Sequence, residues 1–301
     1  MYVSKHFLMY VITGATGHTG KRISENLLAA GKSVKVIGRH ADKLAELVEK
    51  GATAAVGDLN DVNFLTNAFQ GATAVYLMIP PKMDVTDWRA YQRELIAAYI
   101  PALQAAKVQK LVLLSSVGAH MLEGAGPVSG IGELEQALHQ VQGLDVLALR
   151  PGYFMENLFN SVGMIQHAGI NGSIVTADKP VPMVHTSDIA KVATQRLLDL
   201  SFSGHSHEFI SAVKPTFQET TRIIGQAIGK PDLPYIQFSS ADAKAGMLQA
   251  GLPETIADGY VEMQEAMNGA DFTAGYVQSN NLQTPVTLEW FVENELKPAF
   301  N

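Results

Sequence analysis

Short apolar runs alternate with segments of helical periodicity along the first half of the chain. The apolar runs are nearly continuous, which is typical of strands that are buried on both faces of a sheet. They predict strands over Phe7–Ile12, Ser33–Ile37, Ala52–Val56, Ala74–Ile79, Leu111–Ser115 and Leu144–Leu149. The periodic segments predict helices over Thr19–Ala30, Asp42–Lys50, Val62–Phe69, Trp88–Ala106 and Leu134–Val141. This alternation indicates an α/β fold, a Rossmann-type doubly wound parallel sheet with helices on both faces.

The alternation ends after Arg150, where Pro151 and Gly152 interrupt the pattern. Beyond them one short strand is predicted near Glu208–Ile210, and the other periodic segments are helical. These helices cover Asp188–Leu200, Phe217–Ile228, Ala241–Leu248, Glu254–Met267 and Thr287–Glu295. We expect a Rossmann domain over residues 1–152 and a smaller α-rich cap region over residues 153–301, with the helix near 188–200 also packed on the sheet.

The charge and the composition exclude several classes of function. The 301 residues carry a formal net charge of −7, and no dense basic run offers cations to nucleic acid phosphates. The chain has no cysteine, so disulfides, thiolate metal sites and a cysteine nucleophile are excluded. No apolar stretch is long enough to span a bilayer, and the first apolar run is predicted as a strand, not a signal peptide. We therefore expect a cytoplasmic protein without a nucleic acid or membrane partner.

A glycine-rich turn separates the first predicted strand from the first predicted helix. In a dinucleotide site the first glycine permits the tight turn, the second admits the pyrophosphate, and the third allows close packing of the helix on the strand. An ordinary glycine-rich loop is the alternative, but the position in a βαβ series favours a dinucleotide. The expected contacts are Gly14, Thr16, Gly17, His18, Thr19 and Gly20.

The end of the second predicted strand indicates which dinucleotide is bound. An NAD site usually places an acid there for the ribose 2′-hydroxyl, whereas this strand ends in Arg39 and the first acid is Asp42. The Arg39 guanidinium is suited to a 2′-phosphate, and Lys43 could add a second charge. The alternative is that Arg39 is a solvated loop residue. We expect NADP(H), with NAD(H) less favoured.

The ends of the next strands supply further expected cofactor contacts, because ligands bind at the carboxyl ends of such strands. Asp58 is placed to hydrogen-bond the adenine edge with Leu59 beneath the ring, although Asp58 could equally cap the next helix. Ile79 and Pro80 should run along the ribose, and Ser115 ends the fifth strand.

With these residues in place, the chain resembles the NmrA-like family of atypical short-chain dehydrogenases. It is especially similar to the branch that holds NAD(P)H-dependent quinone oxidoreductases. The resemblance covers most of the chain and rests on the glycine turn GATGHTG and on VIGRHADKL, GDLND, LVLLSSVGA, LALRPGYFMENL and PMVHTSDIA. It implies a dinucleotide-binding reductase fold.

Resemblance to catalytic short-chain dehydrogenases would imply a Tyr-x-x-x-Lys pair at the start of the helix after the fifth strand. This chain lacks that pair. Counting back from Glu135 puts the lysine position at Ile131 and the tyrosine position at Pro127. No tyrosine in the chain is followed four residues later by lysine, and no lysine lies between Lys110 and Lys179. The machinery that protonates an unactivated ketone is therefore absent from the sequence.

Two functions are compatible with this pattern. The first is an NADPH-dependent reductase of a small quinone-like acceptor, because a quinone accepts hydride to give a weakly basic phenolate that needs no strong general acid. The second is a sensor of the NADP(H) state that acts through a protein partner, as NmrA-type regulators do. The reductase is favoured. Ser115, His120 and Tyr153 are the candidates for catalysis, and Tyr153 should also border the nicotinamide unless it only fills core.

Several other residues are expected to be structural. His205 and His207 lack a third ligand nearby, so no metal site is predicted. Asp188 is expected as a first-turn acid in a helix capped by Ser187, while Glu156 and Asn157 should make structural hydrogen bonds. Three methionines could line an adaptable pocket but are more simply core residues: Met247, Met263 and Met267.

Overall fold

A seven-stranded parallel sheet forms the centre of the protein in a computed structural model, which describes residues 8–277, 282 and 285–300. Its strand order is β10-β6-β5-β4-β1-β2-β3, so the chain crosses over as a doubly wound fold requires. The strands are β1 (Met9–Ile12), β2 (Ser33–Gly38), β3 (Thr53–Val56), β4 (Ala74–Leu77), β5 (Lys110–Leu114), β6 (Asp145–Pro151) and β10 (His205–Ile210). The predicted fold class is confirmed.

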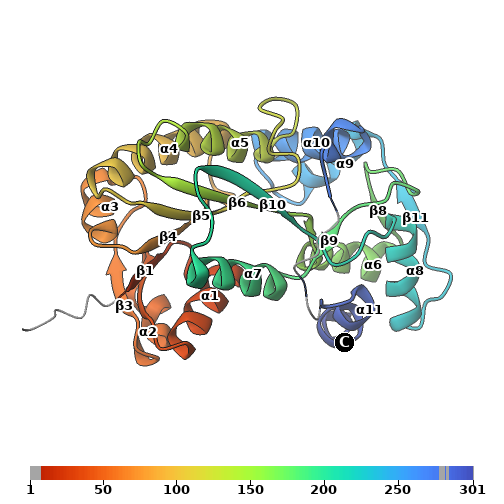
Figure 1. Cartoon of the computed structure of the whole chain (residues 1–301). Coiled ribbons are helices and arrows are strands. Elements are labelled where there is room, and N and C mark those ends of the chain that lie inside the picture. The colour runs from red at the N-terminus through yellow and green to blue at the C-terminus, as the bar shows by residue number, and fades with distance from the viewer. Residues whose placement is uncertain (1–7, 278–281, 283–284, 301) are drawn as a thin grey trace, which may run out of the picture.

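Helices cover both faces of this sheet (Figure 1). One face carries α3 (Val62–Phe69), α4 (Trp88–Ala105) and α5 (Pro127–Leu138). The other carries α1 (His18–Ala29), α2 (Ala41–Glu49) and α7 (Thr186–Asp199). Each layer has its own apolar core: Phe69, Leu95 and Leu134 are buried on the first face, and Ile23 and Ile189 on the second.

Two elements of the sheet layer come from beyond residue 152. Strand β10 pairs in parallel with β6 from His205↔Val146 to Ile210↔Pro151, and it is longer than the three residues predicted there. Helix α7 packs against α1, as expected for the helix near 188–200. A simple boundary at residue 152 therefore does not divide the sheet from the cap. Strand β10 and helix α7 follow that residue in the chain but belong to the sheet layer.

Apolar periodicity places the start of the helix after β5 at Leu134, whereas comparison with short-chain dehydrogenases places it at Pro127. The helix starts at Pro127, not at Leu134, because a proline fits the first position of a helix, where its missing N–H costs no hydrogen bond. Gly130 and Gly132 interrupt the apolar periodicity at the start of this helix. Both are buried, and a Cβ would clash with Gln92 at Gly130 and with the Ala119 carbonyl at Gly132.

The cap region lies beside one end of the sheet and has a third apolar core (Figure 1). Its helices are α6 (Val162–Ala168), α8 (Phe217–Ala227), α9 (Ser240–Gln249), α10 (Glu254–Asn268) and α11 (Leu288–Phe291), with a 3-10 helix at Met155–Ser161 and a π-helical turn at Val292–Leu296. Its strands pair as β7 (Tyr153–Phe154) with β9 (Met183–Val184), and β8 (Asn171–Ser173) with β11 (Tyr235–Gln237). Within the described part of the chain, no helix combines the length and apolarity needed to cross a membrane.

Candidate functional site

The glycine turn leads from β1 into α1 and leaves the start of that helix open to a ligand. Gly17 is the N-cap of α1 and provides no side-chain cap for the first backbone N–H groups. No acidic residue lies in the first turn of the helix. Free N–H groups and the positive end of the helix dipole favour a phosphate here. The turn therefore fits the pyrophosphate of a dinucleotide.

The three glycines of this turn have different surroundings. Gly14 has a φ of +61°, a conformation that favours glycine. A Cβ on Gly20 would lie 2.3 Å from the Gly14 carbonyl oxygen, so only glycine lets α1 pack this close to the turn. A Cβ on Gly17 would meet no atom closer than 3.4 Å. A Cβ at Gly17 therefore meets no close protein atom, and we expect a phosphate to use the same open space.

A small groove of about 130 Å3 lies at the ends of β2, β3 and β4. Its lining contains several of the residues predicted to hold the adenosine half of a cofactor: Gly14, Thr16, Arg39, Asp58, Leu59 and Pro80. Arg39 is exposed, and none of the carboxylates in the described residues forms an ion pair with it. Its guanidinium is thus available to an anionic ligand. Lys43 is exposed on α2 and does not line the groove.

Lys82 also lines the small groove, and no pattern considered above points to it. Its Nζ lies 5.6 Å from the centre of the Tyr91 ring. The signal that could have identified it is its position two residues after Pro80, at the carboxyl end of β4, where ligands bind in such sheets.

Asp58 does not cap the following helix. Asp61 is the N-cap of α3, and its side chain accepts hydrogen bonds from the N–H groups of Asn63 and Phe64. The Asp58 carboxylate accepts from the N–H of Asn60 at 2.9 Å and lies in the small groove. The alternative that Asp58 is a helix cap is therefore wrong, and its adenine contact stays a prediction.

A larger cavity of about 510 Å3, called here the central cavity, begins at the glycine turn and extends under the cap region. Predicted site residues that line it are Gly14, Gly17, His18, Thr19, Ile79, Pro80, Ser115 and Tyr153. Its remaining walls come mainly from apolar side chains at the ends of β4 to β6, the first turn of α5, and α10. Gly20 and His120 line neither this cavity nor the small groove.

The first turn of α5 and the helix α10 give the central cavity much of its apolar surface. Pro127 and Ile131 line it from α5. Tyr260 lines it from α10 and packs edge-on to Trp88, with ring centroids 5.3 Å apart. Met263 and Met267 also line it from α10. Met247, on α9, does not line the cavity, so the pocket role suggested for the three methionines fits only the other two.

Ser115 is buried and its hydroxyl is already engaged. Its Oγ donates a hydrogen bond to the Glu135 carboxylate. Arg150 Nη2 donates to the same carboxylate at 2.5 Å, and Arg150 Nε does so at 3.0 Å. This partly buried ion pair fixes the end of β5 against α5. Sequence reasoning missed the Glu135–Arg150 pair, because Glu135 lies on α5 and Arg150 lies on β6, and no sequence motif links the two positions.

Tyr153 presents a phenol to the central cavity. Burial raises the pKa of Tyr153 well above its usual value, so the hydroxyl keeps its proton at neutral pH. The ring packs edge-on to Phe217 at 5.7 Å, while the hydroxyl makes no hydrogen bond to any residue that the structure describes. His120, by contrast, has its Nε2 2.8 Å from the Asp271 carbonyl oxygen, outside the cavity lining.

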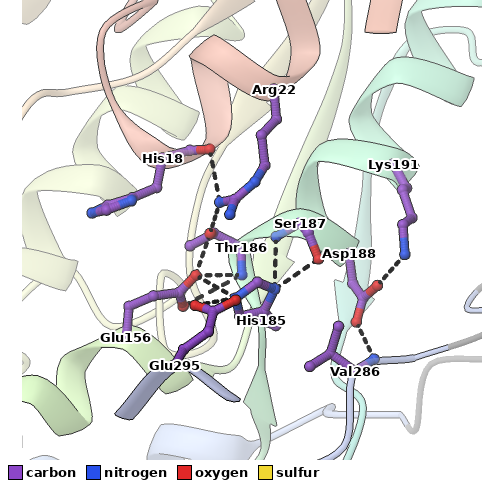
Figure 2. Close-up of polar contacts among 10 residues, drawn as sticks. All are labelled: His18, Arg22, Glu156, His185, Thr186, Ser187, Asp188, Lys191, Val286 and Glu295. Atoms are coloured by element: carbon purple, nitrogen blue, oxygen red, sulfur yellow. Dashed lines mark hydrogen bonds and ion pairs between the residues drawn. The ribbon is translucent and has the colours of Figure 1, made fainter. Parts of the chain in front are cut away.

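A polar cluster surrounds the N-terminus of α7 behind the glycine turn (Figure 2). The Glu156 carboxylate accepts from the N–H and hydroxyl of Thr186, which confirms its structural role. Arg22 of α1 donates to the Thr186 hydroxyl at 2.7 Å and to the His18 carbonyl at 3.3 Å. His185 Nε2 lies 3.2 Å from Glu156 and 3.3 Å from Glu295 near the C-terminus. This cluster joins α1, α7 and the C-terminal segment.

The cap of α7 differs from the prediction. His185, not Ser187, is the N-cap, and its side chain accepts from the Ser187 N–H. Asp188 is 1% exposed and accepts from the Val286 N–H at 2.8 Å, so it fastens the C-terminal segment in addition to lying in the first turn (Figure 2). A histidine was overlooked as the cap because hydroxyl, amide and carboxylate side chains are the usual ones.

The histidines of β10 have neighbours other than a metal. The His205 ring packs on His139 with centroids 4.2 Å apart, and His207 packs edge-on to Phe209 at 5.3 Å. The described residues contain no group of three or more His, Cys, Asp or Glu side chains placed to hold a metal ion.

Comparison with known proteins adds a family and several relatives. Residues 14–199 match the model of a family described as NAD(P)H-binding. The chain is 28% identical over 274 residues to an NAD(P)H azoreductase of Xenophilus azovorans, covering 90% of this chain and 91% of that protein. It is 26% identical to quinone oxidoreductase 2 of Escherichia coli strain K12, covering 83% and 85% of the two chains.

Solved structures share the fold. An NADPH-dependent quinone oxidoreductase of Escherichia coli, crystallised with NADPH, matches with a TM-score of 0.77 and 23% identity over 94% of this chain and 98% of that one. NmrA, a negative transcriptional regulator in complex with NADP, matches with a TM-score of 0.70 and 18% identity over 98% and 96% of the two chains. These likenesses confirm the Rossmann-type fold expected from the sequence.

Proposed function

The chain belongs to the NAD(P)H-binding family, and from that premise we propose that it is an NADPH-dependent reductase of a quinone-like acceptor. The observation that carries the proposal is the central cavity, in which the glycine turn and a wall of apolar and aromatic side chains share one space. Such a cavity can hold a flat ring beside a nicotinamide. The relatives named as an azoreductase and a quinone oxidoreductase support reduction of a flat, conjugated acceptor.

The cofactor assignment rests on two features. The open start of α1 and the room beside Gly17 suit a pyrophosphate. The guanidinium of Arg39 lines the small groove without an ion-pair partner among the described residues, and it suits a ribose 2′-phosphate. Thr16, Asp58, Leu59 and Pro80 are proposed to hold the adenosine half, with Thr19, Ile79 and Tyr153 toward the nicotinamide. When bound, NADPH would supply a hydride.

The acceptor assignment follows from the residues on α5. Pro127 and Ile131 occupy the positions where catalytic short-chain dehydrogenases place tyrosine and lysine, and both face the central cavity as apolar side chains. An unactivated ketone needs a proton as its oxygen gains charge, and these side chains have none to give. A quinone needs less help, because ring aromatisation stabilises the product oxyanion until water protonates it.

The three catalytic candidates have unequal roles in this proposal. Ser115 holds the end of β5 through Glu135, so its proton is not aimed at an acceptor. Tyr153 can donate a hydrogen bond to an acceptor oxygen, which orients the ring. His120 contacts the Asp271 carbonyl and helps to attach the cap. None of the three is an essential proton donor in this proposal, and the cavity as a whole brings the reactants together.

Steady-state oxidation of NADPH with a panel of quinones and simple ketones tests the proposal. We expect turnover of small quinones and none of the ketones. Turnover of unactivated ketones at comparable rates would contradict the acceptor assignment.

A redox sensor is the second candidate, and the polar cluster in Figure 2 favours it. Arg22 on the helix that follows the glycine turn is connected through Thr186 and Glu156 to His185 and Glu295. Nucleotide binding could change the C-terminal segment by this route and so alter a surface for a protein partner. NADPH binding that changes protease sensitivity of residues 153–301, without oxidation by any acceptor, would support the sensor.

A further inference from the structure

We propose that the acceptor is an uncharged flat molecule, and that the central cavity discriminates against anionic and cationic acceptors. This inference rests on the proposed reductase function and specifies the substrate class of the same site.

The lining of the central cavity contains no lysine, arginine, aspartate or glutamate among the described residues. Its polar groups are hydroxyls and amides, such as those of Tyr153, Tyr260 and Gln92, together with His18 at the cofactor end in the glycine turn. Behind the Ser115 side of the wall, the Glu135 carboxylate is paired with Arg150 and accepts a hydrogen bond from Ser115. The acceptor end of the cavity therefore offers no counterion.

A charged substituent would lose its hydration in this cavity without gaining a partner. Desolvating an unpaired charge in an apolar site is strongly unfavourable, whereas a neutral aromatic ring gains by burial and by edge or face contacts with other rings. Tyr260 and Trp88 already pack edge-on in the wall, which suits such contacts. The phenols of Tyr153 and Tyr260 make no hydrogen bonds to residues that the structure describes, so both can donate to a neutral carbonyl or azo group.

The two halves of the site differ in charge. Arg39 and Lys82 both line the small groove, where a phosphate would bind. Among the described residues, no lysine or arginine lines the central cavity. An anionic acceptor is therefore not drawn to the hydride-receiving end by a local charge, and the net charge of −7 repels it further.

The test compares kcat/KM for naphthoquinone, its sulfonate and a trimethylammonium derivative of similar size, with NADPH saturating. We expect the neutral quinone to be preferred over each charged one by roughly tenfold or more. The sulfonate withdraws electrons and makes the ring a better hydride acceptor in solution, so intrinsic reactivity cannot produce this preference. Equal use of either charged quinone would overturn the inference, and the cationic quinone separates cavity desolvation from repulsion by the net charge.

A substituted cavity sharpens the test. Met263→Lys places a cation in the wall, and it should raise kcat/KM for the sulfonate while lowering it for the neutral quinone. Met247→Lys is the matched control, because Met247 is also partly buried but lies outside the cavity. An unchanged preference in folded Met263→Lys would contradict the inference.

Binding separates this inference from the proposed function. If no quinone oxidises NADPH, the reductase proposal fails, and binding of the three quinones to the NADP⁺-saturated protein still decides the substrate class. Tighter binding of the neutral quinone supports the inference, and equal binding of all three refutes it.

Discussion

Arg39→Ala should remove most of the preference for NADPH over NADH. Arg39 is exposed, lines the small groove and has no carboxylate partner among the described residues, so its replacement breaks no internal ion pair. The fold should therefore be unaffected, and the whole effect should fall on the ligand. This makes the substitution a direct test of where a 2′-phosphate binds.

The expected magnitude follows from the exposure of the guanidinium. A charge-assisted hydrogen bond contributes about 1.5–3 kcal/mol, and water and salt screen an exposed contact toward the lower end of that range. At about 1.4 kcal/mol for each factor of ten, a loss of ~1.5–2 kcal/mol corresponds to a loss of about 10- to 30-fold in NADPH affinity. NADH, which lacks the phosphate, should bind the variant almost as it binds the wild type.

Calorimetric titration with both nucleotides measures this effect. Arg222→Ala is the control, because it removes the same charge from an exposed position on α8 and should leave both affinities unchanged. Equal affinities of the wild-type protein for NADPH and NADH would refute the reasoning at its root. A full NADPH preference retained by Arg39→Ala would place the phosphate elsewhere.

Three further predictions concern the glycine turn, the phenol and the pH dependence of stability. Gly17→Val should abolish nucleotide binding in titration, because its side chain would occupy the space proposed for the pyrophosphate. Circular dichroism should stay normal, because a Cβ there meets no protein atom closer than 3.4 Å. Gly246→Val, on the open side of α9, is the control, and retained binding by Gly17→Val would mean that the phosphates lie elsewhere. Single replacements Tyr153→Phe, Ser115→Ala and His120→Ala should each lower quinone turnover modestly, whereas a loss beyond roughly a thousandfold would indicate direct proton transfer. Burial raises the pKa of Tyr76, Tyr99 and Tyr153, so the folded state favours their neutral forms. The free energy of unfolding should therefore fall as the pH rises above about 10, where tyrosine in the unfolded chain ionises. A free energy of unfolding, measured by urea denaturation, that stays constant in this range would contradict these directions.

The sheet and the glycine turn could be predicted because their signals are local. A continuous apolar run followed by Gly14 and a helical pattern specifies a strand, a turn and a helix from neighbouring residues alone. The wall of the central cavity could be predicted less well, because Tyr260 and Met263 reach it through the packing of α10 against α4 and α5. Likewise, neither Glu135–Arg150 nor Asp188–Val286 follows a sequence spacing, since tertiary folding brings each pair together.

Local rules also misled where two residues could do the same task. Asp58 and Asp61 both precede α3, and only backbone geometry decides that Asp61 is its cap. At α7 the buried imidazole of His185 takes the cap position next to Ser187, because Glu156 and Glu295 hold its other nitrogen. Apolar periodicity alone does not reveal the start of α5, because Gly130 and Gly132 allow close packing there but have low helix propensity.

The central claim is that this chain transfers hydride from NADPH to a quinone-like acceptor without a tyrosine–lysine pair. Its most direct test is NADPH consumption by the purified wild-type protein with naphthoquinone in one cuvette and cyclohexanone in another. We predict steady oxidation with naphthoquinone and a rate indistinguishable from the enzyme-free blank with cyclohexanone. Efficient turnover of cyclohexanone, or no oxidation with naphthoquinone by protein that binds NADPH, would contradict the claim.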